Sequence, residues 1–78
     1  MWNYRIIRHK VEDEEDWLAI HEVFYNDNDN PNGCTQKSID VSGEDCDSIK
    51  WQLTKMKEAL DKPILDYQMF LDMEKEDE

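Results

Sequence analysis

The chain has 78 residues and a formal net charge of −11, from 20 acidic and 9 basic side chains. So short a chain has room for one domain with a small core. The charge repels nucleic acid phosphates and anionic membranes, which argues against direct binding to either and favours neutral or basic partners.

The first residues contain no apolar signal segment, and no apolar run approaches the roughly 18 residues that a membrane helix requires. Hydrophobic residues make up 38% of the chain, with three Trp, three Tyr and two Phe, so we expect a folded core and not a disordered chain. The predicted location is the cytoplasm, with Cys34 and Cys46 as thiols and no disulfide.

Two strands are predicted in the first third of the chain. Trp2 to Val11 has Trp2, Tyr4 and Ile6 at alternate positions and no Gly or Pro, as in a half-buried strand. The acidic run Glu12 to Asp16 is the predicted turn after it. Trp17 to Tyr25 carries apolar residues on both faces, which predicts a central strand.

A chain reversal is predicted in the segment Asn26 to Gly33, which consists almost entirely of Asn, Asp, Pro and Gly. Asn32-Gly33 is a strong hairpin-turn dipeptide, and we place the turn there. The next segment, Cys34 to Val41, alternates weakly and is interrupted by Lys37. It is predicted to be an edge strand.

One main helix is predicted to start after Asp45, the N-cap, with Ser42 as an alternative cap. Asp47 in the first turn and three lysines toward the end suit the helix dipole, and Pro63 stops the helix. The apolar stripe that should pack on the sheet consists of Cys46, Ile49, Leu53, Met56 and Leu60, with Leu53 at its centre.

The sequence determines the secondary structure of the C-terminal part less clearly. The period of Ile64 to Leu71 fits either a short helix or an extended segment, so its type stays open. Residues 72–78 are nearly all acidic and are predicted to be a disordered tail. The predicted fold is therefore α+β: a single domain over 1–71, with a three-stranded antiparallel sheet and one main helix packed across one face, followed by the tail.

The segments WNYRI (2–6), AIHEVFY (19–25) and ALDKPIL (59–65) resemble a group of short bacterial proteins with an "NYR" strand, an "IHEVYY" strand and a helix closing in "ALDKPVL". The resemblance spans most of the chain from Trp2 to Leu65 and implies no catalytic residues. The turn at Asn26 to Gly33 and the acidic tail depart from this pattern. In size and charge the chain is also similar to phage-encoded inhibitors of bacterial defence, including anti-CRISPR proteins, although no motif is shared.

No catalytic, cofactor or metal site is predicted. The spacing of Asn28, Asn30 and Asn32 imitates half of a calcium loop, but Ile39 occupies the position of the closing carboxylate. The possible zinc ligands are His9, His21, Cys34 and Cys46, which lack the paired spacing of metal sites. His9 and His21 should be diagonal neighbours at best and are not expected to form an acid/base pair.

Basic residues near the N-terminus do not change the expectation about nucleic acid. Arg5 should lie on the opposite strand face from Arg8 and Lys10, so no continuous basic track forms.

The predicted partner-binding residues are acidic, with one tryptophan. Two groups should converge at one end of the sheet as an anionic pole that imitates phosphates. Trp51 lies off the helix stripe and is a candidate interface anchor, although it could equally cover the sheet edge or pack under Ile64 to Leu71. The residues concerned are Glu12, Asp13, Glu14, Glu15, Asp16, Glu44, Asp45, Asp47 and Trp51.

These features predict a non-enzymatic, acidic protein-binding module. We expect it to act as an anti-CRISPR-like inhibitor that occupies a basic nucleic-acid-binding surface of a defence or nucleic-acid-processing complex. The alternative is a bacterial accessory subunit or regulator whose charge serves only solubility. The sequence does not distinguish phage from cellular origin or specify an oligomeric state.

Overall fold

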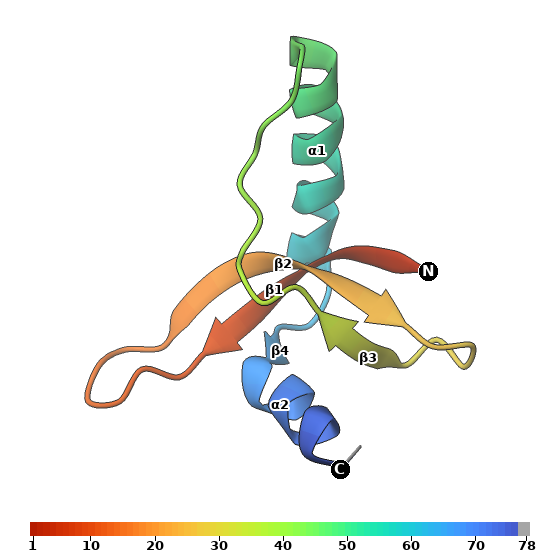
Figure 1. The fold of residues 1–78 in the computed structure, drawn as a ribbon. Coiled ribbons are helices and arrows are strands. Elements are labelled where there is room, and N and C mark those ends of the chain that lie inside the picture. The colour runs from red at the N-terminus through yellow and green to blue at the C-terminus, as the bar shows by residue number, and fades with distance from the viewer. Residues whose placement is uncertain (77–78) are drawn as a thin grey trace.

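The computed structural model describes residues 1–76, which form one curled sheet and two α-helices (Figure 1). The sheet has the strand order β3-β2-β1-β4. The chain is α+β as predicted, but the sheet has four strands and not three. The elements are β1 (Trp2–His9), β2 (Trp17–Tyr25), β3 (Pro31–Cys34), α1 (Cys46–Glu58), the 3-10 turn η1 (Ala59–Asp61), β4 (Leu65–Asp66) and α2 (Tyr67–Glu76).

The hairpin of β1 and β2 is the centre of the sheet and confirms the first two predicted strands. The strands pair antiparallel along their whole length, from Trp2 opposite Phe24 to His9 opposite Trp17. β1 ends two residues before the predicted Val11, whose carbonyl accepts from the Glu14 amide at 3.1 Å as the chain turns. β2 is central as predicted, because β1 and β3 flank it.

The next reversal lies earlier than predicted. The Asn26 side-chain oxygen accepts from the Asn28 and Asn30 amides at 2.9 and 3.1 Å, and the Asn26 amide donates to the Asn30 carbonyl. An Asn side chain that satisfies the loop amides fixes the turn at that residue. Asn32-Gly33 is therefore part of β3, and the prediction that it forms the turn is wrong.

The edge strand predicted over Cys34 to Val41 is also wrong in its extent. β3 ends at Cys34. Beyond it, the Thr35 amide donates to the Glu22 carbonyl at 3.0 Å and the Ile39 amide to the Ile20 carbonyl at 2.9 Å. Four residues of this segment thus run beside two of β2, so residues 36–38 bulge out and are exposed. The bulge ends the ladder.

The C-terminal segment contains both types of structure that its period allowed. Leu65 and Asp66 form β4, which pairs parallel with Ile7 and Arg8 of β1. α2 then runs from Tyr67 to Glu76. The first five residues of the predicted tail therefore belong to this helix, and residues 77–78 lie outside the described part of the chain.

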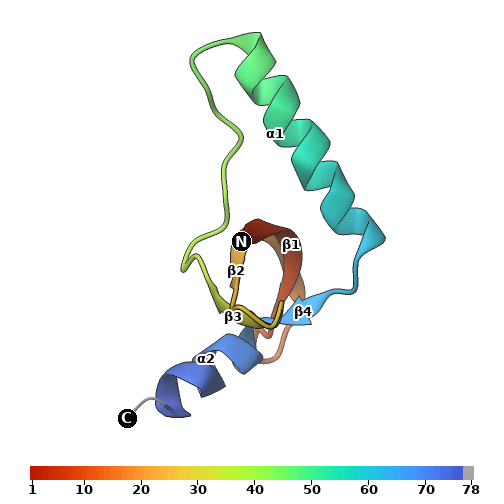
Figure 2. The ribbon, with the colours of Figure 1, turned by 90° about the vertical axis from the view of Figure 1, so that its right-hand side faces the viewer.

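α1 begins as predicted but does not lie across the sheet. Asp45 is the N-cap, and its Oδ1 accepts from the Ser48 amide at 2.8 Å. From there the helix descends toward the sheet and meets β1 only near its C-terminal end (Figures 1 and 2). Met56 is the one buried residue of α1, while Leu53 is 53% exposed. The prediction of a helix packed across one face is wrong.

The segment before α1 explains this position. Residues 40–45 run from the edge of β2 up to the first turn of the helix as a strap (Figure 2). The Gln52 side chain holds the strap by donating to the Ser42 carbonyl at 2.6 Å and accepting from its amide. Glycine is needed at position 43, where the strap passes the first turn of α1, because a Cβ there would stand 2.8 Å from Ser48 Cβ. The strap keeps the first half of α1 away from the sheet.

Two small apolar clusters, one on each face of the sheet, replace the single predicted core. Tyr4 packs with Met56 and Ala59 on the α1 side. Ile7 and Val23, both with no exposed surface, pack with Phe70 on the α2 side. Residues of even number on β1 face α1, and those of odd number face α2, as the period of two requires.

Arg5 is a buried cation that joins β1 to the segment before β4. It is 8% exposed, and its Nη1 and Nη2 donate to the Tyr25 hydroxyl at 2.8 Å and to the Pro63 carbonyl at 2.7 Å. The Tyr25 hydroxyl donates in turn to Asn3 Oδ1. Neutral oxygens therefore accept from the two terminal nitrogens of the guanidinium, whereas Nε has no hydrogen-bond partner among the described residues.

Candidate protein-binding site

Trp51 projects from α1 and is 51% exposed. Together with Asp45, Asp47, Ser48 and Gln52 it borders a shallow hollow beside the first turns of the helix. The structure thus brings three of the predicted partner-binding residues together: Asp45, Asp47 and Trp51. Glu44 directly precedes them and is exposed. Their proximity follows from helical spacing, since residues four apart lie on one face.

A groove of about 320 Å³ continues from Trp51 toward β1. Its wall on the strand side includes Trp2, which is 43% exposed and packs edge-to-face on Tyr4 with ring centroids 5.3 Å apart. The remaining lining residues are Met1, Asn3, Lys55, Glu58 and Lys62. Sequence reasoning missed this role of Trp2, because it treated Trp2 only as a strand residue.

The two predicted acidic groups do not converge. Glu12 to Asp16 form the turn between β1 and β2, beyond the ends of those strands, whereas Glu44, Asp45 and Asp47 lie at the top of α1 (Figures 1 and 2). The prediction assumed that the third strand returns along the full length of β2. β3 is short, and the strap leads away from the sheet instead. The anionic pole is absent from the described structure.

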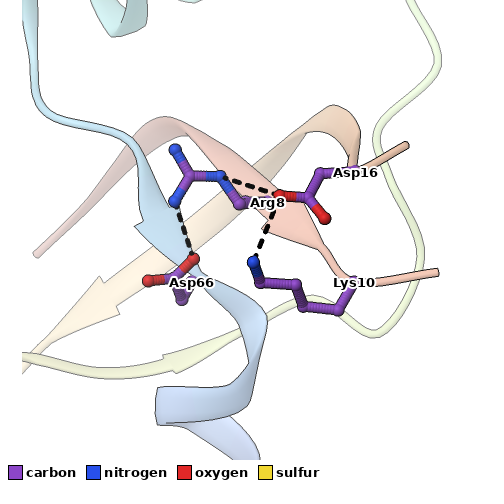
Figure 3. A network of polar contacts seen from close by, with 4 residues as sticks. All are labelled: Arg8, Lys10, Asp16 and Asp66. Carbon is purple, nitrogen blue, oxygen red and sulfur yellow. Dashed lines mark hydrogen bonds and ion pairs between the residues drawn. The ribbon is translucent and has the colours of Figure 1, made fainter. Parts of the chain in front are cut away.

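Asp16 is partly neutralised by two basic side chains of β1 and the following turn (Figure 3). Its Oδ2 lies 3.2 Å from Lys10 Nζ and 3.8 Å from Arg8 Nε. Arg8 Nη1 also reaches Asp66 Oδ1 at 3.2 Å, which links the turn to β4. Asp16 therefore takes part in the internal structure of the hairpin end, while Glu12 to Glu15 remain exposed without such pairs among the described residues.

His9 and His21 are diagonal neighbours, the nearest relation that the sequence allowed, but their direct contact was not predicted. Their Nε2 atoms are 2.9 Å apart, although His9 lies opposite Trp17 in the register and His21 opposite Arg5. Both side chains are on the α2 face of the curled sheet, with small Ala19 between them on β2. The sequence indicates only that both histidines lie on the same face of the sheet, because both have odd positions in the paired strands. The short distance between them depends on the curvature of the sheet.

The surroundings of the two imidazoles differ. His21 is 1% exposed, and its Nδ1 lies 2.9 Å from the Thr35 carbonyl and 3.3 Å from Thr35 Oγ1. His9 is half-buried, and its ring lies 4.6 Å from that of Tyr67 at the start of α2. Burial and the neighbouring His21 lower the pKa of His9 from its ordinary 6.5. His9 is therefore mainly neutral at pH 7.

The other candidates for metal or redox chemistry lie apart. Cys34 is half-buried in β3 and Cys46 is exposed at the start of α1, so no disulfide joins them. Within residues 1–76 the structure contains no group of three or more His, Cys, Asp or Glu side chains that could hold a metal ion. Asn28 and Asn30 engage Asn26 through their amides in the loop.

Comparison with protein families, curated proteins and solved structures found no match. The resemblance to short bacterial proteins therefore remains a prediction. In the described part of the chain, neither helix has the length and apolar character needed to cross a membrane.

Proposed function

We propose that this protein is a non-enzymatic protein-binding module that docks on a basic surface of its partner through the face of α1 that carries Trp51. The observation that carries the proposal is the position of Trp51, half-exposed on a helix that stands off the sheet. Tryptophan is the residue type most enriched among binding hot spots, and it needs a recess on the partner.

The charge on the N-terminal side of Trp51 supports a basic partner, whereas Lys55 and Lys62 line the groove on its other side. Asp45 and Asp47 lie on its N-terminal side, next to exposed Glu44. Carboxylates at the rim of an interface mainly increase the rate of association and discriminate against acidic partners. The net charge of −11 acts in the same direction over a longer range.

The proposal no longer includes imitation of a phosphate backbone by a single acidic pole. Glu12 to Asp16 are separated from the Trp51 region in both views of the fold. A nucleic-acid-binding protein remains one class of partner with the required basic surface, and occupation of that surface would inhibit it.

Site-specific photo-crosslinking tests the proposal. A benzophenone amino acid replaces Trp51 in one sample and Trp17 in the other. Trp17 is a matched control, because it is 67% exposed at the far end of the hairpin. In cells of the source organism we expect a discrete adduct from position 51 and none of the same mass from position 17.

The crosslinked partner is then purified for binding measurements. Trp51→Ala should weaken binding at least about tenfold, in keeping with a hot spot of more than about 1.4 kcal/mol, and Trp17→Ala should not. Asp47→Lys should weaken binding more than Glu14→Lys, with the difference shrinking at high salt. Equal affinity of Trp51→Ala and the wild type, with both proteins folded, contradicts the proposal.

A further inference from the structure

The tautomers of the His9 and His21 pair follow from their partners. The Thr35 carbonyl only accepts hydrogen bonds, so His21 Nδ1 carries a hydrogen and donates it at 2.9 Å. In the neutral ring His21 Nε2 is then bare and accepts from His9 Nε2–H. The buried imidazole thus directs an unprotonated nitrogen toward His9.

The setting of His21 is the one that metalloproteins give to a histidine ligand. A ligating imidazole commonly donates its other N–H to a backbone carbonyl or a carboxylate, which fixes the ring and its tautomer. Here the carbonyl of Thr35 has that role, and the burial of His21 holds the ring in place. The Tyr67 ring packs against His9 with ring centroids 4.6 Å apart and an interplanar angle of 34°.

A shallow surface hollow lies beside the pair and is lined by both histidines, of which the half-buried His9 is the more accessible and His21 is 1% exposed. Asp40 and Lys37 border the same hollow with opposite charges, and Ser38 and Gln36 are also part of its wall. A hydrated cation can therefore approach His9 from outside, and it reaches the buried His21 nitrogen by replacing the hydrogen bond between the two rings.

We propose that His9 and His21 form a two-histidine site for a late divalent transition metal ion, zinc or nickel, with water in the remaining coordination positions. Imidazole nitrogen is a suitable ligand for both ions. The metal takes the place of the shared hydrogen: His9 loses the Nε2 proton to solvent and gains one at Nδ1, so both Nε2 lone pairs bind the ion without net proton release.

The required movement is small. For Zn–N bonds of about 2.0–2.1 Å in tetrahedral geometry, two ligand nitrogens stand about 3.3 Å apart. The present separation is 2.9 Å. A displacement of about 0.4 Å is within reach of the half-buried His9 ring, while His21 stays bonded to Thr35. The site is thus nearly formed by the fold alone.

Calorimetric titration of the untagged full chain with zinc chloride, and separately with nickel chloride, at pH 7.5 tests the site. We expect one ion to bind per chain. His9→Gln should weaken binding by at least about tenfold, the range in which even outer partners of a metal site act. This variant removes a half-buried ring, so thermal unfolding can confirm that it remains folded; His21→Gln is the second variant.

Two further variants and an NMR measurement test which residues bind the ion. Lys37→Ala removes a positive charge beside the hollow and should tighten binding several-fold. Cys46→Ser should leave it unchanged, since that exposed thiol lies on α1. Nitrogen NMR of the imidazoles should show zinc-dependent shifts at Nε2 of both histidines. Absence of binding, binding that survives His9→Gln in a folded protein, or binding that Cys46→Ser abolishes would each overturn the proposal.

Discussion

At the scale of single residues, the pair of His9 and His21 shows how local chemistry depends on distant neighbours. Each histidine lies on a predicted strand, and both have the same parity. What the pair does is determined by Thr35 and Tyr67, which come from the segment after β3 and from α2. An imidazole without these partners would be an ordinary strand residue.

Stability should fall on mild acidification because of His9. Its pKa in the folded protein is below the ordinary 6.5, through burial and through His21. As the pH falls, the unfolded chain therefore binds a proton at His9 before the folded protein does. The contribution of His9 to the free energy of unfolding is complete above pH 6.5, and it is lost as the pH falls toward the pKa of the folded protein.

Urea unfolding between about pH 7.5 and pH 5.5 measures this effect, since most carboxylates remain ionised over that window. We expect the free energy of unfolding to decrease toward pH 5.5 in the wild type and less steeply in His9→Gln. Parallel pH profiles of the two proteins would show that His9 does not contribute.

At the scale of elements, α1 carries a regular apolar stripe that is only partly used. Met56 is 5% exposed at the contact with β1, but Leu53 and Leu60 are 53% and 68% exposed. Helical periodicity identifies the side of a helix that is apolar. It does not state how much of that side reaches the sheet, which here depends on the strap held by Gln52.

The two stripe positions should therefore respond differently to truncation. Met56→Ala removes a buried side chain and should cost about 2–5 kcal/mol of the free energy of unfolding. Leu53→Ala should cost less than about 1 kcal/mol, because the side chain is already half in water. The sequence pattern places Leu53 at the centre of the stripe that should pack on the sheet, which predicts the larger cost for this residue.

Chemical denaturation of both variants gives the comparison, with Leu60→Ala as a second exposed position. A cost for Leu53→Ala as large as that for Met56→Ala would mean that α1 lies against another surface in solution, either the sheet or a second molecule.

At the scale of the whole molecule, the charge is spread over separate parts. Exposed acidic residues occupy the turn between β1 and β2, the loop after β2, and the start of α1. Among the described residues, a few ion pairs such as those of Asp16 with Arg8 and Lys10 offset them. A net charge of −11 on so small a fold favours expansion through self-repulsion.

Salt should consequently stabilise the protein. Raising sodium chloride from about 0.05 M to about 0.5 M shortens the Debye length from roughly 14 to 4 Å and screens this repulsion. We expect the thermal midpoint to rise by several degrees. A variant with Glu12, Glu14 and Glu15 changed to Gln should show a smaller rise.

The surface ion pairs act in the opposite sense, since salt weakens them as well. A midpoint that falls with added salt would show that pairs such as Arg8 with Asp66 outweigh the repulsion.

Local signals were reliable wherever a residue and its immediate neighbours decide the structure. The bounds of β2, the acidic turn before it, and the Asp45 cap are such cases, since alternation, charge and capping act within a few residues. The prediction of a turn at Asn32-Gly33 was wrong for a related reason, because the same segment contains a second strong turn former, Asn26. The Asn26 side chain accepts from two loop amides and so fixes the turn there.

For the candidate sites, too, the sequence could predict the groupings that depend on local spacing and not those that depend on the tertiary structure. Asp45, Asp47 and Trp51 are near one another because helical spacing ensures it, so their grouping was predictable. The separation of these residues from Glu12 to Asp16, and the meeting of His9 with His21, were not. The separation depends on the path of residues 36–45, which bulge from β2 and rise to α1 (Figure 2). The contact between the two histidines depends on the curvature of the β1–β2 hairpin.

The sequence by itself determined the α+β class, the central hairpin, the start of α1 and a strongly acidic surface, because period, capping and charge are local or additive properties. Only the tertiary structure decided that α1 stands off the sheet, that Leu65 and Asp66 add a parallel fourth strand, and that two imidazoles share a hydrogen. Those outcomes depend on contacts between residues far apart in the chain, such as Arg5 with Pro63 and His21 with Thr35. Such contacts form only when several elements are already in place, so no window of the sequence contains them.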